Sequence, residues 1–226
     1  MRAPARWTTI PALAAAAALA AACAPGLQVG PPLPDPGAAA RRAAEFPDDR
    51  GPALLRFEWE YADERGNVEG DGAARVNPPD SLRADLFTSG DVSLAAALAS
   101  GRLTTSGQIE NVSLPSAPFL YAMAGLFRPA ADGPDEAFST NRGVLLRYRT
   151  NGGLRREYLM DGGRLLRLED RRDGRLLRRV TVRWDSGGVW PVSAEYRSTV
   201  APRRVRWRVR EVDPRPQPFE PDIYDL

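Results

Sequence analysis

The stretch Arg203-Arg204-Val205-Arg206-Trp207-Arg208-Val209-Arg210 alternates charged and apolar side chains with a period of two. Successive side chains of a β-strand point to opposite faces, so the pattern predicts a strand with valine and tryptophan on one face and arginine on the other. The stretches Leu176–Trp184 and Val189–Thr199, just before it, alternate in the same way. The chain therefore ends in a sheet with one apolar, aromatic face and one charged face.

Turn sequences separate these stretches and extend the pattern upstream. Asn151-Gly152-Gly153, Asp161-Gly162-Gly163, Asp173-Gly174 and Ser186-Gly187-Gly188 carry residues that tolerate positive φ. Each joins strand to strand and opens no helix, so none is read as a phosphate-binding loop. The strands predicted after Gly143 form an antiparallel meander: Val144–Thr150, Leu154–Met160, Arg164–Asp170, Leu176–Trp184, Val189–Thr199 and Arg203–Val212.

The first half of the chain predicts more strands and one helix. The strands are Leu54–Tyr61, Val68–Asn77, Ser81–Phe87, Val92–Ala99 and Arg102–Ser106. Pro115–Phe127 predicts a helix with its apolar residues at helical spacing, and Pro129–Asn141 reads as a polar loop. A helix of this length spans about 20 Å and cannot cover so many strands, so the sheet is expected to curl around it.

This reasoning predicts one domain, mainly β with a small helical part, in which a strongly curved antiparallel sheet holds the apolar helix against its concave face. The inward-facing aromatic and apolar side chains are either plain core or the lining of a groove. The groove candidates are Phe57, Trp59, Phe119, Met123, Phe127, Trp184, Trp190 and Trp207.

The N-terminus predicts export. Arg2 and Arg6 precede an apolar run, Ile10–Ala22, that is too short to span a bilayer of ~30 Å. Leu19-Ala20-Ala21-Ala22-Cys23 resembles a bacterial lipobox, with Leu four rather than three positions before the cysteine. The resemblance implies cleavage before Cys23 and acylation of its thiol and amine. The alternative is an ordinary secretory peptide cut after an A-x-A site, with Cys23 incidental.

Three segments follow from these patterns. Residues 1–22 are the signal peptide, 23–52 a lipidated cysteine with a Pro/Ala-rich tether, and 53–226 the β domain with a proline-rich tail. Within the tether, 38–46 could form a short helix begun by Asp35-Pro36. Phe219, Ile223 and Tyr224 in the tail could dock back on the domain.

Composition excludes several functions. The chain contains no histidine, so a Ser/His/Asp arrangement is impossible and the most common metal ligand is missing. Loss of Arg2 and Arg6 with the signal balances the 31 basic and 29 acidic residues, which argues against nucleic acid as a partner. The acids are read as solvated or in turns, such as Asp161, Asp173 and Asp185. We therefore predict a non-enzyme without catalytic residues, cofactor or metal.

The arginine ladder Arg204, Arg206, Arg208 and Arg210 has two interpretations. It is either an outer face paired with acids on neighbouring strands, such as Glu195, or a surface resting on anionic lipid headgroups.

A tethered domain with antiparallel strands up to Pro78-Pro79-Asp80-Ser81-Leu82-Arg83, an apolar helical insert and then a meander resembles the LolA/LolB superfamily. The resemblance covers roughly residues 53–212. It implies an unclosed half-barrel with a helical lid, whose concave face receives the acyl chains of lipoproteins. The expected function is thus an outer-membrane lipoprotein, anchored through acylated Cys23 and facing the periplasm, that binds a lipid or lipoprotein acyl chain in envelope assembly. Ala24 replaces the aspartate that would resemble an inner-membrane retention signal. The alternative is a structural or partner-binding lipoprotein with a filled core, and the oligomeric state is left open.

Overall fold

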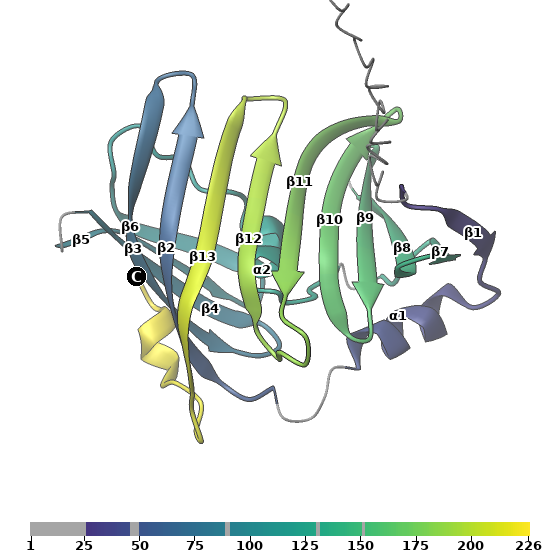
Figure 1. The fold of residues 1–226 in the computed structure, drawn as a ribbon, viewed down its shortest axis with the longest axis horizontal. Coiled ribbons are helices and arrows are strands. Elements are labelled where there is room, and N and C mark those ends of the chain that lie inside the picture. Colours follow the sequence, from purple (N-terminus) through teal and green to yellow (C-terminus); the bar gives the residue numbers. More distant parts are fainter. Residues whose placement is uncertain (1–25, 46–49, 89–90, 130–131, 151) are drawn as a thin grey trace, which may run out of the picture.

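The computed structural model describes residues 26–45, 50–88, 91–129, 132–150 and 152–226, with the side chains of 91–93 excepted. Two α-helices and a 3-10 turn accompany the strands (Figure 1). The helical elements are α1 (Pro36–Ala44), α2 (Ala117–Met123) and η1 (Pro221–Tyr224). The strands are β1 (Val29–Pro32), β2 (Ala53–Asp63), β3 (Gly66–Asn77), β4 (Ser81–Thr88), β5 (Asp91–Ala99), β6 (Arg102–Gly107), β7 (Glu136–Thr140), β8 (Gly143–Thr150), β9 (Leu154–Asp161), β10 (Arg164–Arg172), β11 (Arg175–Trp184), β12 (Pro191–Ser198) and β13 (Arg203–Pro214).

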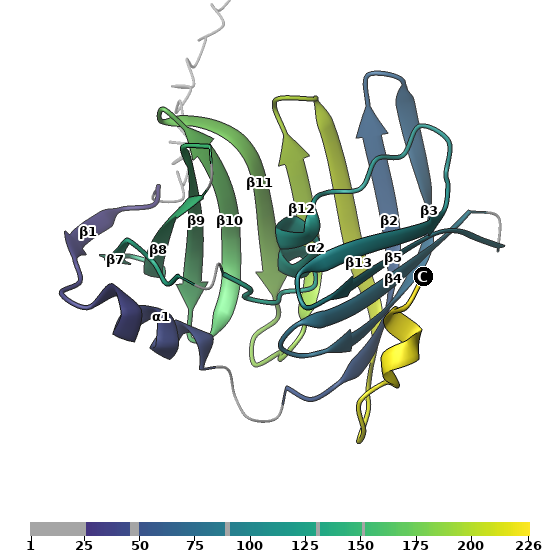
Figure 2. The same ribbon diagram turned by 180° about the vertical axis from the view of Figure 1, so that it is seen from behind.

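All strands belong to one antiparallel sheet of 13 strands in the order β1-β7-β8-β9-β10-β11-β12-β13-β2-β3-β4-β5-β6. The strands at the two ends of this order, β1 and β6, do not pair with each other, so the sheet is not closed into a barrel. It curls strongly, and β4–β6 face β11 and β12 across the interior (Figure 2). The prediction of a mainly β fold with a strongly curved, unclosed antiparallel sheet is confirmed.

Strand β13 lies between β12 and β2, so it joins the C-terminal meander to the N-terminal strands. Trp207 lies opposite Ala194 of β12 and Trp59 of β2. The arginines between the inward residues lie opposite acids: Arg206 faces Glu195 and Glu60 in the same register. The alternation in the sequence thus sets the two faces of the sheet, apolar inside and charged outside.

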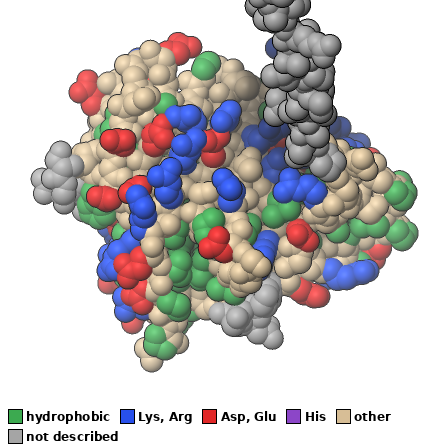
Figure 3. Space-filling model, viewed as in Figure 1, with side chains coloured by type: hydrophobic (Ala, Val, Ile, Leu, Met, Phe, Trp, Pro, Cys, Tyr) green, Lys and Arg blue, Asp and Glu red, His purple; other side chains and the backbone are tan. Residues whose placement is uncertain are grey.

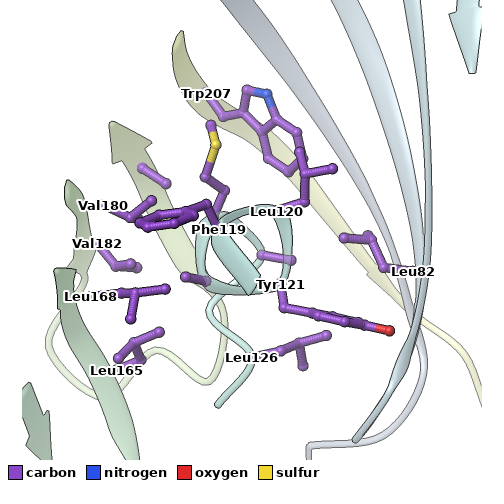
Figure 4. Close-up of a cluster of buried hydrophobic side chains, with 14 of the residues drawn as sticks. Leu82, Phe119, Leu120, Tyr121, Leu126, Leu165, Leu168, Val180, Val182 and Trp207 are labelled. Carbon is purple, nitrogen blue, oxygen red and sulfur yellow. The ribbon is translucent and has the colours of Figure 1, made fainter. Parts of the chain in front are cut away.

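Helix α2 lies inside the curve, against β10, β11 and β12 (Figure 2). Phe119 points toward Val180 on one side of the helix, and Tyr121 points toward Leu82 on the other (Figure 4). The predicted placement on the concave face is confirmed, but the helix is shorter than the predicted 115–127. It ends before Gly125, whose φ of +72° L-residues rarely adopt. A Cβ there would also lie 2.8 Å from the Trp184 ring.

The segment expected to be an extended tether contains two folded elements. Strand β1 pairs with β7, and α1 packs against β7 and β8. The Asp35 carboxylate accepts a hydrogen bond from the Ala38 amide at 2.8 Å, so α1 begins where the Asp-Pro pair predicts. The expectation of a tether is therefore wrong for residues 29–44, because β7 and β8 offer a sheet edge on which this segment folds.

Strand β7 lies within the predicted polar loop, which is a second correction. Its five residues, Glu-Ala-Phe-Ser-Thr, carry little apolar pattern. Pairing with β8 on one side and β1 on the other makes it a strand. Tertiary partners override a weak local preference here.

The C-terminal tail docks on the domain through η1, which contacts β4 and β5. Tyr224 is buried, and the Asn77 side chain both donates to and accepts from the backbone of Phe219 at 3.0 Å. Among the described residues, no helix has both the length and the apolar character needed to cross a membrane.

Candidate functional site: the concave side of the sheet

The predicted groove residues lie in a packed interior. Phe57, Trp59, Phe119, Met123 and Trp207 are each no more than 2% exposed and Trp190 is 6% exposed. Trp184 and Phe127 are half-buried against this core. Most of the predicted set is therefore brought together around α2, but as close-packed neighbours.

Ring contacts show how tight this interior is. Phe57 stacks on Trp207 with ring centroids 4.5 Å apart. Phe119 meets Tyr196 edge-on at 5.3 Å, and Phe127 meets Tyr158 at 5.1 Å. These are the offset and T-shaped arrangements that aromatic pairs favour, so the rings around α2, and Phe119 on the helix itself, have specific neighbours.

Arg50 binds the backbone at the C-terminal end of α2. Its guanidinium donates hydrogen bonds to the carbonyl oxygens of Gly125 at 2.9 Å and Ala124 at 3.1 Å. The same group lies 4.4 Å from the Trp190 ring and 5.4 Å from the Trp184 ring. Burial lowers the pKa of Arg50 to about 9, so the group remains charged at neutral pH. A cation at this position matches the negative end of the helix dipole.

A buried ion cluster also lies on the concave face. Asp170 is fully buried and accepts two hydrogen bonds from Arg156, at 2.8 and 3.0 Å, with Arg178 at 3.2 Å. Both guanidiniums lie over the Phe119 ring, at 5.6 and 5.4 Å from its centroid. Asp170 is two residues after the inward-facing Leu168, which was the available signal that it points inward.

The expectation that the acids are solvated is thus wrong for Asp85, Glu157, Glu169 and Asp170, all of which are buried. Each is matched by arginines on its own strand or a neighbouring one, which offsets the cost of removing the carboxylate from water. Asp161, Asp173 and Asp185 are exposed as predicted. A single strand's alternation could not reveal the full pairing, because each of these acids also has an arginine partner on another strand.

A hollow of about 760 Å³ lies between α1 and the adjacent ends of β8 and β9. Val144 and Met160 are register partners that line it and face the same side as Leu146 and Tyr158, the concave side. This volume lies within the range of about 300–1,000 Å³ that is typical of small-molecule sites. Its lining is Leu33, Pro34, Asp35, Ala39, Arg42, Ala43, Glu45, Gly143, Val144, Met160, Gly162 and Gly163.

None of the predicted groove residues lines this hollow, and the sequence analysis missed it. The available signal was α1 itself: a helix whose sheet-facing residues, Ala39 and Ala43, are too small to fill the space beneath it. The prediction could not use that signal, because nothing in the sequence says which strands α1 covers.

Two tyrosine phenols, those of Tyr148 on β8 and Tyr158 on β9, are buried on the concave side. Burial raises the pKa of Tyr158 to about 12 and raises that of Tyr148, so both phenols are neutral at neutral pH. Within the described ranges, no group of three or more His, Cys, Asp and Glu side chains is placed to hold a metal ion. Cys23 and the predicted signal peptide lie outside the described residues.

No protein-family model matches the chain, and no curated protein sequence matches it. Solved structures do resemble it, among them a LolA superfamily protein from Nitrosomonas europaea, 10% identical, covering 83% of this chain and 96% of that one with a TM-score of 0.48. A domain named for outer membrane lipoprotein sorting, from Vibrio parahaemolyticus, is 13% identical and covers 83% and 94% with a TM-score of 0.49. A DUF1329 family protein from Desulfovibrio piger is 8% identical and covers 84% and 98% with a TM-score of 0.46. The superfamily named from the sequence is thus found again among similar structures, and at these identities and TM-scores the likeness concerns the fold alone.

Proposed function

We propose that this protein is a lipoprotein of the bacterial outer membrane, anchored through acylated Cys23 and facing the periplasm, that binds an acyl chain of a lipid or lipoprotein. The binding site is the concave-side hollow between α1 and the ends of β8 and β9. The observation that carries the proposal is the combination of the hollow's size with the apolar side chains of Leu33, Val144 and Met160 in its lining.

The hollow lies beside α1 and near the β1 end of the unclosed sheet. Apolar walls would take up methylene groups, each worth ~0.8 kcal/mol when removed from water. Arg42 in the lining offers a cation and hydrogen-bond donor for a carboxylate or ester group at the end of the chain, whereas Asp35 and Glu45 would repel a carboxylate.

A second function is favoured by a different observation. The α2 residues Phe119–Ala124 are at most 1% exposed, so the centre of the concave face is filled. A lipoprotein that serves an envelope complex only through protein contacts would need such a core and no ligand.

Uptake of a fluorescent fatty acid by the full chain carrying Cys23→Ser separates the two functions, since that variant has no acyl chain of its own. We expect saturable uptake, and we expect Ala43→Trp to reduce it by filling the hollow. Ala44→Trp is the matched control, because Ala44 is exposed and this substitution adds the same side chain to the outer side of α1. Absence of uptake in the parent would contradict the ligand-binding proposal and support the structural function.

The anchor has its own test. The wild-type protein should fractionate with membranes and carry the mass of its acyl groups, and Cys23→Ser should release it. Two or more acyl chains anchor stably where one is marginal. Native mass measurement after gentle extraction would count any further lipid bound in the hollow.

A further inference from the structure

We propose that the convex face of β8–β11 is a docking surface for an anionic membrane, on which its arginines contact lipid phosphates. The surface consists of Arg147, Arg149, Arg155, Arg167, Arg171 and Arg179. Five of them flank two buried glutamates, and together these side chains cover the face opposite to α2.

The charges on this face are layered. The side chains of Glu157 and Glu169 are only 8% and 1% exposed. Arg147, Arg155 and Arg171 lie 2.9, 3.0 and 3.5 Å from Glu157, and Arg167, Arg171 and Arg179 lie 3.2, 2.8 and 2.6 Å from Glu169. Glu157 and Glu169 therefore lie beneath the arginines that surround them, and the charge directly above these two acids is positive.

The arginines also outnumber the acids. Each of the two glutamates lies near three guanidiniums, with Arg171 near both, so five arginines share two buried carboxylates. Arg147 also pairs with the exposed Glu136 at 3.4 Å, which leaves an excess of two positive charges over these three acids. Arg149 has the most exposed side chain of the six, at 88%, and it pairs with Asp135 at 4.0 Å, whose carboxylate also accepts a hydrogen bond from the Arg149 amide. Figure 3, drawn from the convex side, shows arginine side chains both on this part of the face and over β12, β13 and β2.

The predicted arginine ladder on β13 does not have this layering. Arg204 and Arg206 pair with Glu60, Arg206 also pairs with Glu195, and Arg208 and Arg210 pair with Glu58. These acids are themselves accessible, with Glu58 40% exposed. Of the two interpretations of the ladder, cross-strand pairing is the one that the contacts bear out. What distinguishes the surface on β8–β11 is that its central acids, Glu157 and Glu169, are buried.

The position of the surface suits a membrane-tethered chain. β8 is separated from β1 only by β7, and the Gln28 amide donates to the Asn141 side chain at 3.0 Å in the β7–β8 turn. The described chain thus starts beside this half of the sheet. Only this step rests on the proposed function, which places a lipid anchor at Cys23; the charge layering stands without it.

The test uses the full chain carrying Cys23→Ser, so that binding depends on the surface and not on acylation. We expect it to sediment with vesicles of phosphatidylglycerol and phosphatidylcholine, not with pure phosphatidylcholine, and to be released as salt rises. Each arginine near an anionic membrane contributes about fivefold in partition, so Arg149→Gln/Arg155→Gln/Arg179→Gln should lose roughly a hundredfold. Glu157 keeps Arg147 and Arg171 in this variant, and Glu169 keeps Arg167 and Arg171, so the buried acids stay paired.

Two variants make the test specific. Arg→Lys at the same three positions keeps the charge and should keep the binding. Arg56→Gln/Arg208→Gln/Arg210→Gln removes equal charge from the β2–β13 part of the same face and should change binding less than threefold. Three outcomes would overturn the proposal: an equal loss of binding in both glutamine variants, equal binding to neutral and anionic vesicles, or no binding to vesicles at all. Binding only to an acidic protein would replace the membrane as the partner. None of these arginines lines the hollow in which fatty-acid uptake is expected. A protein that binds vesicles but takes up no fatty acid would therefore contradict the proposed function and leave the docking surface standing.

Discussion

The two helices on the concave side cover the same kind of surface with opposite results. α2 carries Phe119, Leu120, Tyr121 and Met123, all at most 1% exposed, and these side chains pack closely where the helix meets β10–β12. α1 presents Ala39 and Ala43 to β8 and leaves a hollow of about 760 Å³. Side-chain size on the covering helix, rather than the curvature of the sheet, therefore decides where this half-barrel is filled and where it can take a ligand.

The largest expected effect is at the ion cluster beside α2. Asp170→Asn leaves Arg156 and Arg178 without their buried counter-charge, and should lower the free energy of unfolding by about 3–5 kcal/mol. Asp161→Asn, in an exposed turn, is the control and should change it little. Denaturant midpoints measure both. Equal stability of the two variants would mean that the cluster does not hold the α2 half together.

Truncation within α2 comes next. Met123→Ala or Phe119→Ala should leave a void and cost about 2–5 kcal/mol, because both side chains have fixed neighbours. The sequence analysis allowed that α2 could instead be a lid facing replaceable ligand. A small stability loss combined with weaker fatty-acid uptake would restore that interpretation, and would place the ligand in the α2 half of the interior.

The β-pattern was readable from the sequence because it is local. The residues of β13 alternate, glycine pairs mark the turns, and Asp35-Pro36 marks the start of α1. β7 was missed because its strand character comes from its partners β1 and β8. The candidate site was harder to predict than the strands. Phe57, Trp59 and Trp207 were rightly read as inward-facing. Whether an inward side chain meets a helix or a hollow depends on which helix covers which strands, and the sequence does not say this. The partners of Asp170 could not be predicted for the same reason, since its arginines are on β9 and β11, although its spacing from Leu168 did indicate that it points inward.

Low pH should reduce the free energy of unfolding through the buried carboxylates of the convex face. Burial raises the pKa of Glu169, but Arg167, Arg171 and Arg179 outweigh it, so the pKa lies below the usual 4.5. The unfolded chain therefore binds more protons below that pH, and stability should fall as pH drops from about 4.5 through the folded-state pKa, with a slope of at most ~1.4 kcal/mol per pH unit from this group. Glu169→Gln should flatten the acid branch of a plot of unfolding free energy against pH. An unchanged slope in that variant would assign the acid sensitivity to other carboxylates.

The smallest effect gives the sharpest comparison of the two helices, because the same substitution can be made in both. Ala122 on α2 is fully buried in a filled region, whereas Ala43 on α1 lines the hollow. Leucine has nearly the helix propensity of alanine, so propensity contributes little to either change. Ala122→Leu forces three extra carbons into a packed core and should cost about 1–3 kcal/mol. Ala43→Leu places them in empty space and should change the free energy of unfolding by less than about 1 kcal/mol, in either direction, because the apolar area it buries offsets its ordering.

The denaturant midpoints of the two leucine variants, measured together with fatty-acid titrations, test whether the space under α1 differs from the core around α2. Ala43→Leu should reduce uptake while preserving stability, and Ala122→Leu should reduce stability while leaving the affinity of the remaining folded protein unchanged. If both variants lose equal stability, the hollow is no roomier than the core and α1 is packed as firmly as α2. If Ala122→Leu instead lowers affinity, acyl chains reach the α2 half, and the helix there must move to admit them.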